Sequence, residues 1–257
     1  MRVAAIQPDT VWEDPGANFA RLEPMIATAA AGGARLVALT EMFSTGFSMD
    51  TATIAEPPGG VSSTFLVEQA VRHDVWICGS IAEFAPGATR PGNVAILAAP
   101  DGTVHRYTKI HPFSYAHEDE HYVAGDSFLT VDIEGVRVTV FVCYDLRFAN
   151  EFWARAPETD CYLVVANWPA SRAAHWPALL RARAIENQAY VIGTNRVGTG
   201  NGVEYAGGSV IVDPFGVELA AAGGEETTVD ADVDPARVAE VRARYPFLPD
   251  RREIPNP

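Results

Sequence analysis

The residue that first suggests chemistry is Cys143, which follows the apolar run of residues 138–142. A β-branched and aromatic run of this kind is typical of a buried strand. Residues 144–147 (YDLR) follow at once and predict a loop or the start of a helix. α/β proteins place reactive groups at such strand ends, and a helix N-terminus there can lower the pKa of a thiol. The alternative is a small core residue, because free cysteine is among the most buried residue types.

Two further side chains with useful chemistry stand at the ends of predicted strands. Glu41 comes after the apolar residues 36–39, and Lys109 ends a strand predicted over residues 103–108. Each has a simpler interpretation, since the carboxylate can cap a helix or lie in a solvated loop, and the lysine can be a surface charge. In a layered α/β fold, however, strand ends can converge on one cleft. The sequence therefore allows Glu41, Lys109 and Cys143 to share one site.

A thiol, a carboxylate and an ammonium group together suit acyl transfer. The thiol attacks, the carboxylate takes its proton and later activates water, and the ammonium stabilises the oxyanion. A cysteine protease would use histidine in place of this Glu and Lys pair. No histidine here stands in an equivalent strand-end position, although His111 and His117 keep that alternative open.

The elements that must position these residues follow from apolar periodicity and turn signals. Early βα units, later hairpins and further βα units predict two mixed sheets covered by helices. We expect residues 46–60 to be irregular and to form the rim of a pocket, and the acidic residues 117–121 can form a hydrated loop. The predicted strands are residues 2–7, 36–39, 75–81, 92–98, 103–108, 131–133, 136–142, 161–167, 191–194, 209–212 and 227–233. The predicted helices are residues 15–31, 62–73, 149–155, 173–187 and 235–244, with a tail to Pro257.

Composition and charge argue against several classes of partner. With a net charge of −14, the chain is a poor partner for nucleic acid and anionic membranes. It shows no apolar stretch long enough to span a bilayer and no signal segment before the first strand. Its three cysteines lack disulfide-framework and metal-ligand spacing, which favours a reducing compartment. We expect a cytoplasmic protein without a metal site.

Three motifs occur in an informative order and spacing. Residues 39–43 (LTEMF) contain the glutamate, residues 107–113 (YTKIHPF) the lysine, and residues 142–148 (VCYDLRF) the cysteine. Together they resemble the Glu, Lys and Cys motifs of the nitrilase superfamily of carbon–nitrogen hydrolases. The resemblance covers nearly the whole chain.

This resemblance implies a four-layer αββα sandwich, formed as a single carbon–nitrogen hydrolase domain over residues 1–257. It also implies catalytic roles for Glu41, Lys109 and Cys143, no metal or organic cofactor, and a homodimer. Family members carry a second glutamate shortly after the lysine. Glu118 matches it best, and Glu120 is the other candidate.

The branch of the family follows from finer features. The Cys-Tyr-Asp sequence resembles amidase-type branches, and residues 166–172 (ANWPASR) and 183–188 (RAIENQ) resemble bacterial omega-amidases. Such enzymes hydrolyse the terminal amide of small dicarboxylate monoamides such as 2-oxoglutaramate. Gly208 stands where the resemblance predicts aspartate. The alternatives are an N-carbamoyl amino acid amidohydrolase, an aliphatic amidase, and a catalytically silent binding protein.

Four residues are predicted to contact the small amide substrate: Phe113, Tyr144, Arg147 and Trp168. The resemblance implies an oxyanion hole formed by the backbone N–H of Tyr144 and the Lys109 ammonium. Arg147 would hold the distal carboxylate through a charge-assisted pair. Its alternative role is a structural ion pair with Asp145 or Glu186.

Overall fold

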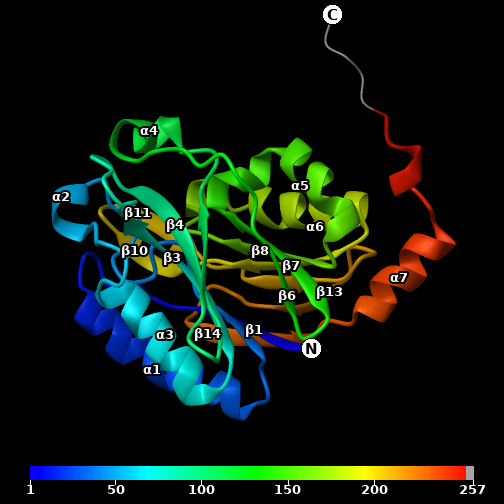
Figure 1. Ribbon diagram of the computed structural model, residues 1–257, viewed down its shortest axis with the longest axis horizontal. Coiled ribbons are helices and arrows are strands. Elements are labelled where there is room, and N and C mark those ends of the chain that lie inside the picture. Colours follow the sequence, from blue (N-terminus) through cyan, green and yellow to red (C-terminus); the bar gives the residue numbers. More distant parts are fainter. Residues whose placement is uncertain (253–257) are drawn as a thin grey trace, which may run out of the picture.

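The computed structural model describes residues 1–252 and packs two mixed β-sheets face to face, with helices on both outer sides (Figure 1). Within these residues each sheet has six strands, and a separate hairpin adds two more. The arrangement confirms the predicted four-layer αββα sandwich. Residues 253–257, the end of the predicted tail, lie outside the described residues.

The first sheet consists of β1 (Arg2–Gln7), β2 (Leu36–Ala38), β3 (Trp76–Glu83), β4 (Gly92–Ala98), β5 (Val104–Thr108) and β14 (Thr227–Asp232). Their order is β14-β1-β2-β3-β4-β5. The pairs β1–β2 and β2–β3 are parallel, and the remaining pairs are antiparallel. Because β14 pairs with β1, the first and last strands of residues 1–252 lie next to each other in one sheet.

The second sheet consists of β6 (Thr130–Ile133), β7 (Val136–Val142), β8 (Cys161–Val165), β9 (Tyr190–Thr194), β12 (Val210–Val212) and β13 (Glu218–Ala221). Their order is β13-β12-β9-β8-β7-β6, with β7, β8 and β9 parallel. The hairpin of β10 (Val197–Gly200) and β11 (Val203–Ala206) stands outside both sheets. It corresponds to the Gly-rich segment between two predicted strands.

Helices cover the outer face of each sheet (Figure 1). The first sheet is covered by α1 (Pro15–Ala31) and α3 (Val61–His73), and the second by α5 (Ala149–Arg155) and α6 (His175–Asn187). The remaining α-helices are α2 (Thr51–Ile54), α4 (Glu118–His121) and α7 (Pro235–Arg244). No helix in residues 1–252 is long and apolar enough to cross a membrane.

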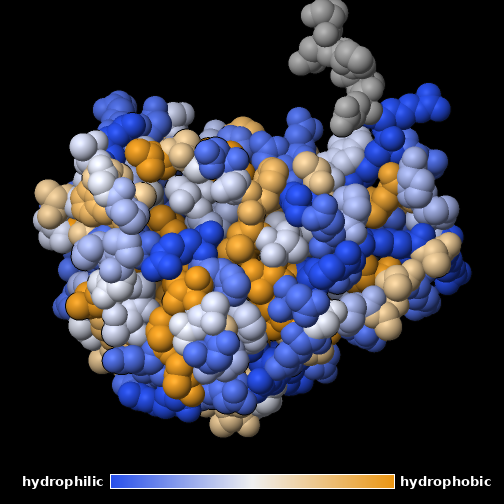
Figure 2. Space-filling view, in the orientation of Figure 1, coloured by the Kyte–Doolittle hydropathy of each residue, from blue (hydrophilic) through white to orange (hydrophobic). Residues whose placement is uncertain are grey.

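Alternation along β1 shows how the layers form. Val3 and Ala5 belong to the apolar cluster between the sheets, whereas Ala4 and Ile6 belong to the cluster under α1 and α3. Successive side chains of a strand point to opposite faces, so an all-apolar strand fits a sheet that is covered on both sides. On the face shown in Figure 2, hydrophobic residues are interspersed among hydrophilic ones.

Strand direction determines where the chemically active residues lie. β5 is antiparallel to β4, and β4 is antiparallel to β3, so β5 runs in the same direction as β2. The carboxyl ends of β2 and β5 therefore share one edge of the first sheet, where Glu41 and Lys109 follow. The parallel strands β7 and β8 end together in the second sheet, where Cys143 and Asn167 follow.

Most predicted elements are confirmed, but three short elements were not predicted. Residues 46–60 include α2, and β13 was not expected. The acidic segment is not a hydrated loop, because it forms α4 with Glu118 completely buried. These elements are only four residues long, and such short elements depend on tertiary contacts more than on local pattern. Cys78 and Cys161 are buried within β3 and β8, as predicted.

Packing of the second sheet against α5 yields a stability prediction at Phe141, which is fully buried and stacks on Phe152 of that helix with ring centroids 4.1 Å apart. Phe141→Ala should lower the free energy of unfolding by about 3–5 kcal/mol, because it removes a buried ring and leaves a cavity. Urea unfolding measures the change. Phe247→Ala is the matched control, since that ring is 57% exposed and its removal should cost far less. Equal losses for the two variants would contradict the described core.

Candidate active site

A cavity of about 290 Å³ lies at the shared edge of the two sheets. Glu41, Lys109 and Cys143 all line it, so the structure brings the three predicted catalytic residues together. The four predicted substrate contacts line it as well. The complete lining is Glu41, Phe47, Lys109, Phe113, Tyr115, Ala116, Cys143, Tyr144, Arg147, Asn167, Trp168, Pro169, Ser171, Arg172, Val203 and Tyr205.

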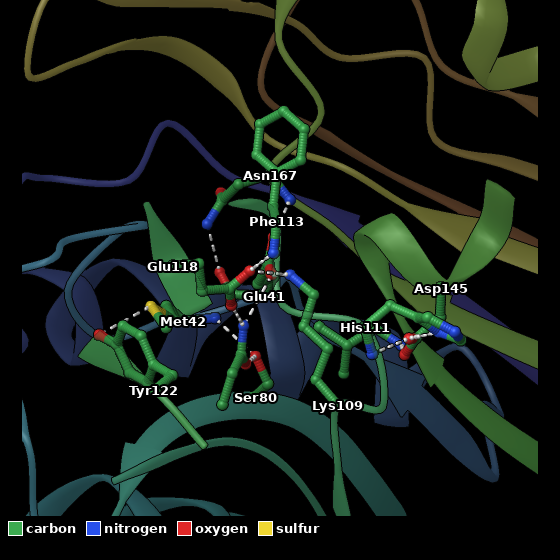
Figure 3. Close-up of polar contacts among 12 residues, drawn as sticks. Glu41, Met42, Ser80, Lys109, His111, Phe113, Glu118, Tyr122, Asp145 and Asn167 are labelled. Atoms are coloured by element: carbon green, nitrogen blue, oxygen red, sulfur yellow. Dashed lines mark hydrogen bonds and ion pairs between the residues drawn. The ribbon is translucent and has the colours of Figure 1, made fainter. Parts of the chain in front are cut away.

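The Lys109 ammonium lies between two carboxylates (Figure 3). Its Nζ is 2.9 Å from Oε1 of Glu41 and 2.8 Å from Oε2 of Glu118. All three side chains are at most 1% exposed. Glu118 does not line the cavity, so it contacts the site through Lys109. Glu120, the other candidate for the second glutamate, is exposed and contacts His117 instead.

Asn93, near the start of β4, joins the two carboxylates from the other side. Its Nδ2 donates to Oε1 of Glu41 at 2.8 Å and to Oε1 of Glu118 at 2.9 Å. The amide is itself oriented, because Ser80 Oγ donates to its Oδ1 at 2.8 Å and accepts from the Met42 N–H at 2.9 Å. All the side chains of this buried hydrogen-bond network therefore have partners, as a stable buried polar network requires.

Asn167, just after β8, ties Glu41 to the second sheet. Its backbone N–H donates to Oε2 of Glu41 at 2.9 Å, and its Nδ2 donates to the Glu41 carbonyl at 2.8 Å. The two bonds hold both the carboxylate and the backbone of Glu41. As a result, the glutamate of the first sheet has a fixed position relative to residues that follow the strands of the second.

Asp145 performs the corresponding task for the turn that carries Cys143. Its buried carboxylate accepts from Tyr107 Oη at 2.8 Å and from the backbone N–H groups of His111 at 2.9 Å and Val142 at 3.1 Å. Tyr107 and His111 flank Lys109 in the sequence. The carboxylate therefore joins the cysteine turn to the lysine segment (Figure 3).

The backbone at Cys143 is strained. Its φ is +44°, in the left-handed region that non-glycine residues seldom adopt, and a short 3-10 helix, Cys143–Arg147, begins at this residue. Such a conformation costs on the order of 1–3 kcal/mol and persists where surrounding contacts enforce it. Here the Asp145 bonds supply those contacts. The strained turn exposes the thiol to the cavity at the carboxyl end of β7.

The electrostatics around the thiol correct one expectation. Burial raises the pKa of Cys143 well above its ordinary value, and the Glu41 carboxylate adds to this against the opposing Lys109 charge. The sequence suggested that a helix N-terminus can lower the pKa of this thiol. The structure has only a short 3-10 helix after the cysteine, and the pKa is not lowered. At neutral pH the resting sulfur is therefore a protonated thiol beside a carboxylate.

Lys109 and Glu118, the other charged groups of this cluster, also have shifted pKa values. Burial by itself would lower the pKa of Lys109, but the charges of Glu118 and Glu41 outweigh burial and raise it. Burial raises the pKa of Glu118, with a further contribution from Glu41, although Lys109 opposes the shift. The ammonium is thus the permanent charge of the cluster.

The predicted substrate contacts form the other walls of the cavity. The Phe113 and Tyr144 rings pack together with centroids 4.8 Å apart, and the Arg147 guanidinium lies 4.9 Å from the Trp168 ring. Neither structural alternative for Arg147 holds in the described residues. Asp145 bonds to other groups, and Arg183, not Arg147, pairs with Glu186.

Several lining and supporting residues were not predicted. Asn93, Asn167, Arg172 and Tyr205 each contact the cavity or its carboxylates. Two signals were present in the sequence: a polar residue beside an apolar run at Asn93, in residues 92–98 (GNVAILA), and the segment 166–172 (ANWPASR), which contains Asn167 and Arg172 but indicated no role for either residue. For Tyr205, on β11, the pattern gives no indication that the hairpin covers the cavity.

The position at which aspartate was expected has a structural function here. Gly208 has φ +82°, and its carbonyl accepts a hydrogen bond from Trp176 Nε1 at 2.8 Å. The Trp176 ring in turn packs against Trp168 of the cavity wall, with centroids 5.4 Å apart. Gly208 itself does not line the cavity.

The charge cluster gives a direct spectroscopic prediction, because Lys109 is the only lysine in the sequence. In protein labelled with isotopic lysine, one side-chain NMR signal reports on this ammonium alone. Since Glu118 and Glu41 raise the pKa of Lys109, the signal should stay that of the charged form past the ordinary midpoint of about 10.4, for as long as the protein remains folded.

The urea-unfolded protein is the control and should titrate near the ordinary midpoint. Glu118→Gln removes one carboxylate and should lower the midpoint in the folded state. A folded wild-type protein whose lysine loses its proton at or below the ordinary value would contradict the described cluster.

Known proteins are similar to this chain over nearly its whole length. The model of the carbon-nitrogen hydrolase family matches residues 2–243. The chain is 41% identical to an omega-amidase YafV of Yersinia enterocolitica, with 97% of this chain and 96% of the relative covered. It is 32% identical to a 2-oxoglutaramate amidase of Bacillus subtilis, with 98% and 97% covered.

A solved structure is similar over its full length. XC1258 from Xanthomonas campestris, described as a CN-hydrolase superfamily protein with an arsenic adduct in the active site, is 35% identical to this chain. It aligns with a TM-score of 0.93 over 100% of this chain and 99% of that one. The motifs, the fold and these similarities lead to one conclusion: the chain belongs to the carbon–nitrogen hydrolase family, the nitrilase superfamily.

Proposed function

We propose that the protein is an omega-amidase, which hydrolyses the terminal amide of small dicarboxylate monoamides such as 2-oxoglutaramate and releases ammonia. The activities in the names of the Yersinia and Bacillus relatives support this proposal. The observation that carries it is the cavity itself, where a thiol, a carboxylate and an ammonium group face the same small volume.

The first half of the reaction forms a thioester. The substrate carbonyl binds at Lys109 Nζ, which has three N–H groups and gives two of them to Glu41 and Glu118. The third is available to the developing oxyanion, with the backbone N–H of Tyr144 as the second donor. The Cys143 sulfur attacks the amide carbon while its proton passes to Glu41, and that proton then leaves with the amine as ammonia.

The second half hydrolyses the thioester. A water molecule takes the place of ammonia, and Glu41 removes its proton as the oxygen attacks the acyl carbon. The carbon–sulfur bond breaks, the sulfur regains a proton, and the free acid leaves. The bonds from Asn93 and Asn167 keep Glu41 in one orientation through both halves.

Glu118 contributes as a positioning residue. It holds the Lys109 ammonium from the side away from the cavity and also accepts the Phe113 backbone N–H. Its carboxylate therefore locates both the oxyanion donor and a residue of the cavity wall. With Glu41 it offsets the desolvation of the ammonium, which would otherwise favour a neutral amine.

Within the cavity, Arg147 would bind the distal carboxylate of the substrate. Its guanidinium has a planar donor geometry that suits a carboxylate.

The family resemblance also supports three further proposals: the protein is a homodimer, it lies in the cytoplasm, and each chain forms a single domain. Light scattering of the purified protein would measure the oligomeric state.

Ammonia release from a panel of amides tests the proposal. The panel contains 2-oxoglutaramate, glutaramate, an uncharged aliphatic amide and an N-carbamoyl amino acid. We expect the carboxylate-bearing ω-amides to give the highest kcat/KM, because only they match both ends of the cavity. Preference for the N-carbamoyl amino acid or the uncharged amide would support the corresponding alternative. A protein that releases no ammonia from any of the four amides would contradict an enzymatic function.

The same assay tests the nucleophile. Cys143→Ala should abolish turnover, leaving at most a background several orders of magnitude below wild type, since no other thiol lines the cavity. Cys78→Ala is the matched control, because that thiol is buried within β3 and burial raises its pKa to about 12. If turnover followed Cys78 rather than Cys143, the site assignment would be refuted.

A further inference from the structure

Two arginines line the cavity, Arg147 and Arg172, and in the described residues neither forms an ion pair with an acidic side chain. The chain has 33 Asp and Glu residues, so acidic partners are abundant. Eleven other arginines do pair with them: Arg2, Arg21, Arg35, Arg72, Arg106, Arg137, Arg155, Arg181, Arg183, Arg196 and Arg237. The cavity thus has two guanidinium groups whose charge the protein leaves uncompensated.

Arg172 is held in place by aromatic rings. It ends the 3-10 helix Ala170–Arg172, and its guanidinium lies 5.2 Å from the Phe113 ring and 6.0 Å from the Tyr115 ring. Aromatic faces attract a cation without consuming its N–H donors, which lie in the plane of the guanidinium. Within residues 1–252 the structure shows no hydrogen bond from this side chain, so its donors remain available to a ligand.

Trp168 connects the positions of the two arginines. Its ring lies 4.9 Å from the Arg147 guanidinium, and its Nε1 donates to the Arg172 carbonyl at 2.9 Å. The ring is itself fixed, since the Trp168 backbone N–H donates to Asn195 Oδ1 at 2.7 Å and its carbonyl accepts from Asn195 Nδ2 at 3.1 Å. Arg147 also contacts His175, with Nη2 and Nδ1 3.1 Å apart.

The cavity offers these arginines no internal counter-ion. Among residues 1–252, Glu41 is the only acidic residue in the lining, and its carboxylate oxygens already accept from Lys109, Asn93 and Asn167. Two half-buried guanidinium groups without an acidic partner, beside a carboxylate whose oxygens already accept hydrogen bonds, favour a ligand that brings its own negative charge.

We propose that Arg172 is a second carboxylate anchor and a specificity-determining residue, which binds the distal carboxylate of the substrate together with Arg147. The proposal rests on the proposed function in that the substrate is a small ω-amide. It goes further because it assigns anion selection to a residue outside the Glu, Lys and Cys motifs. The amide end of the substrate then lies at Cys143 and the anionic end between the two guanidinium groups.

The experiment compares two substrates that differ only in the distal charge: glutaramate and pentanamide, its uncharged counterpart of equal length. Arg172→Gln should raise KM for glutaramate by about 30-fold or more, since losing one partner of a desolvated charge pair costs at least that factor. The effect on kcat should be smaller, and the loss on pentanamide much smaller. Arg147→Gln should show the same pattern.

Arg244→Gln is the matched control. That guanidinium also lies against an aromatic ring, Tyr245, at 5.2 Å, and has no acidic partner in the described residues, but it does not line the cavity. It should leave both substrates unaffected. Arg172→Lys keeps the positive charge but loses the planar pair of N–H donors of the guanidinium. Its KM for glutaramate should therefore lie between those of the wild type and Arg172→Gln. Circular dichroism confirms that each variant is folded.

A binding measurement separates failure of this proposal from failure of the proposed function. In the Cys143→Ala background, calorimetry measures the Kd of glutaramate with and without Arg172→Gln. A wild-type protein that releases no ammonia from any ω-amide would refute the omega-amidase function, while a weaker Kd in the Arg172→Gln background would still support the anion anchor. Equal losses on glutaramate and pentanamide, or an unchanged Kd, would overturn the assignment of Arg172.

Discussion

The structure depends on a single buried ammonium group. Removing the Lys109 charge from water costs several kcal/mol, and such a charge persists only with close partners of opposite sign. Glu41 and Glu118 provide them at 2.9 and 2.8 Å, and Asn93 donates to both carboxylates. Because these residues follow β2, begin α4 and lie in β4, the ion cluster requires three separate parts of the chain to meet.

The same cluster determines how the proposed chemistry is organised. In the proposed reaction Lys109 would stabilise negative charge on the substrate oxygen. Glu41, held beside it, would accept the proton of the Cys143 thiol, whose pKa is raised by burial and by that carboxylate. Attack by the Cys143 sulfur is thereby coupled to the transfer of its proton, so the resting enzyme does not need a thiolate. Arg147 and Arg172 also line the cavity, so under the proposal a substrate with a neutral amide and an anionic tail binds in the orientation that brings its amide to Lys109 and its tail to the two arginines.

The sequence predicts those elements whose signals are local. The helices at Pro15 and Pro235 begin where expected because Asp14 and Asp234 cap them, each accepting a backbone N–H at 2.9 Å, and proline favours the first helical position. β13, by contrast, forms only because β12 offers an edge, and α4 forms where Glu118 meets Lys109. Arg172 lies in the segment 166–172 that the resemblance singled out, but its place in the site could not be predicted, since only tertiary packing brings its side chain to the cavity of Cys143.

The most direct measurement of the central claim is a crystal structure of the Cys143→Ala protein with glutaramate bound. The account predicts the amide oxygen within hydrogen-bond distance of Lys109 Nζ, with the ammonium still bonded to Glu41 and Glu118. The amide carbon should face residue 143, and the carboxylate should lie at the arginine end of the cavity. A bound amide oxygen that Lys109 does not contact, or a lysine that has left its two carboxylates, would contradict it.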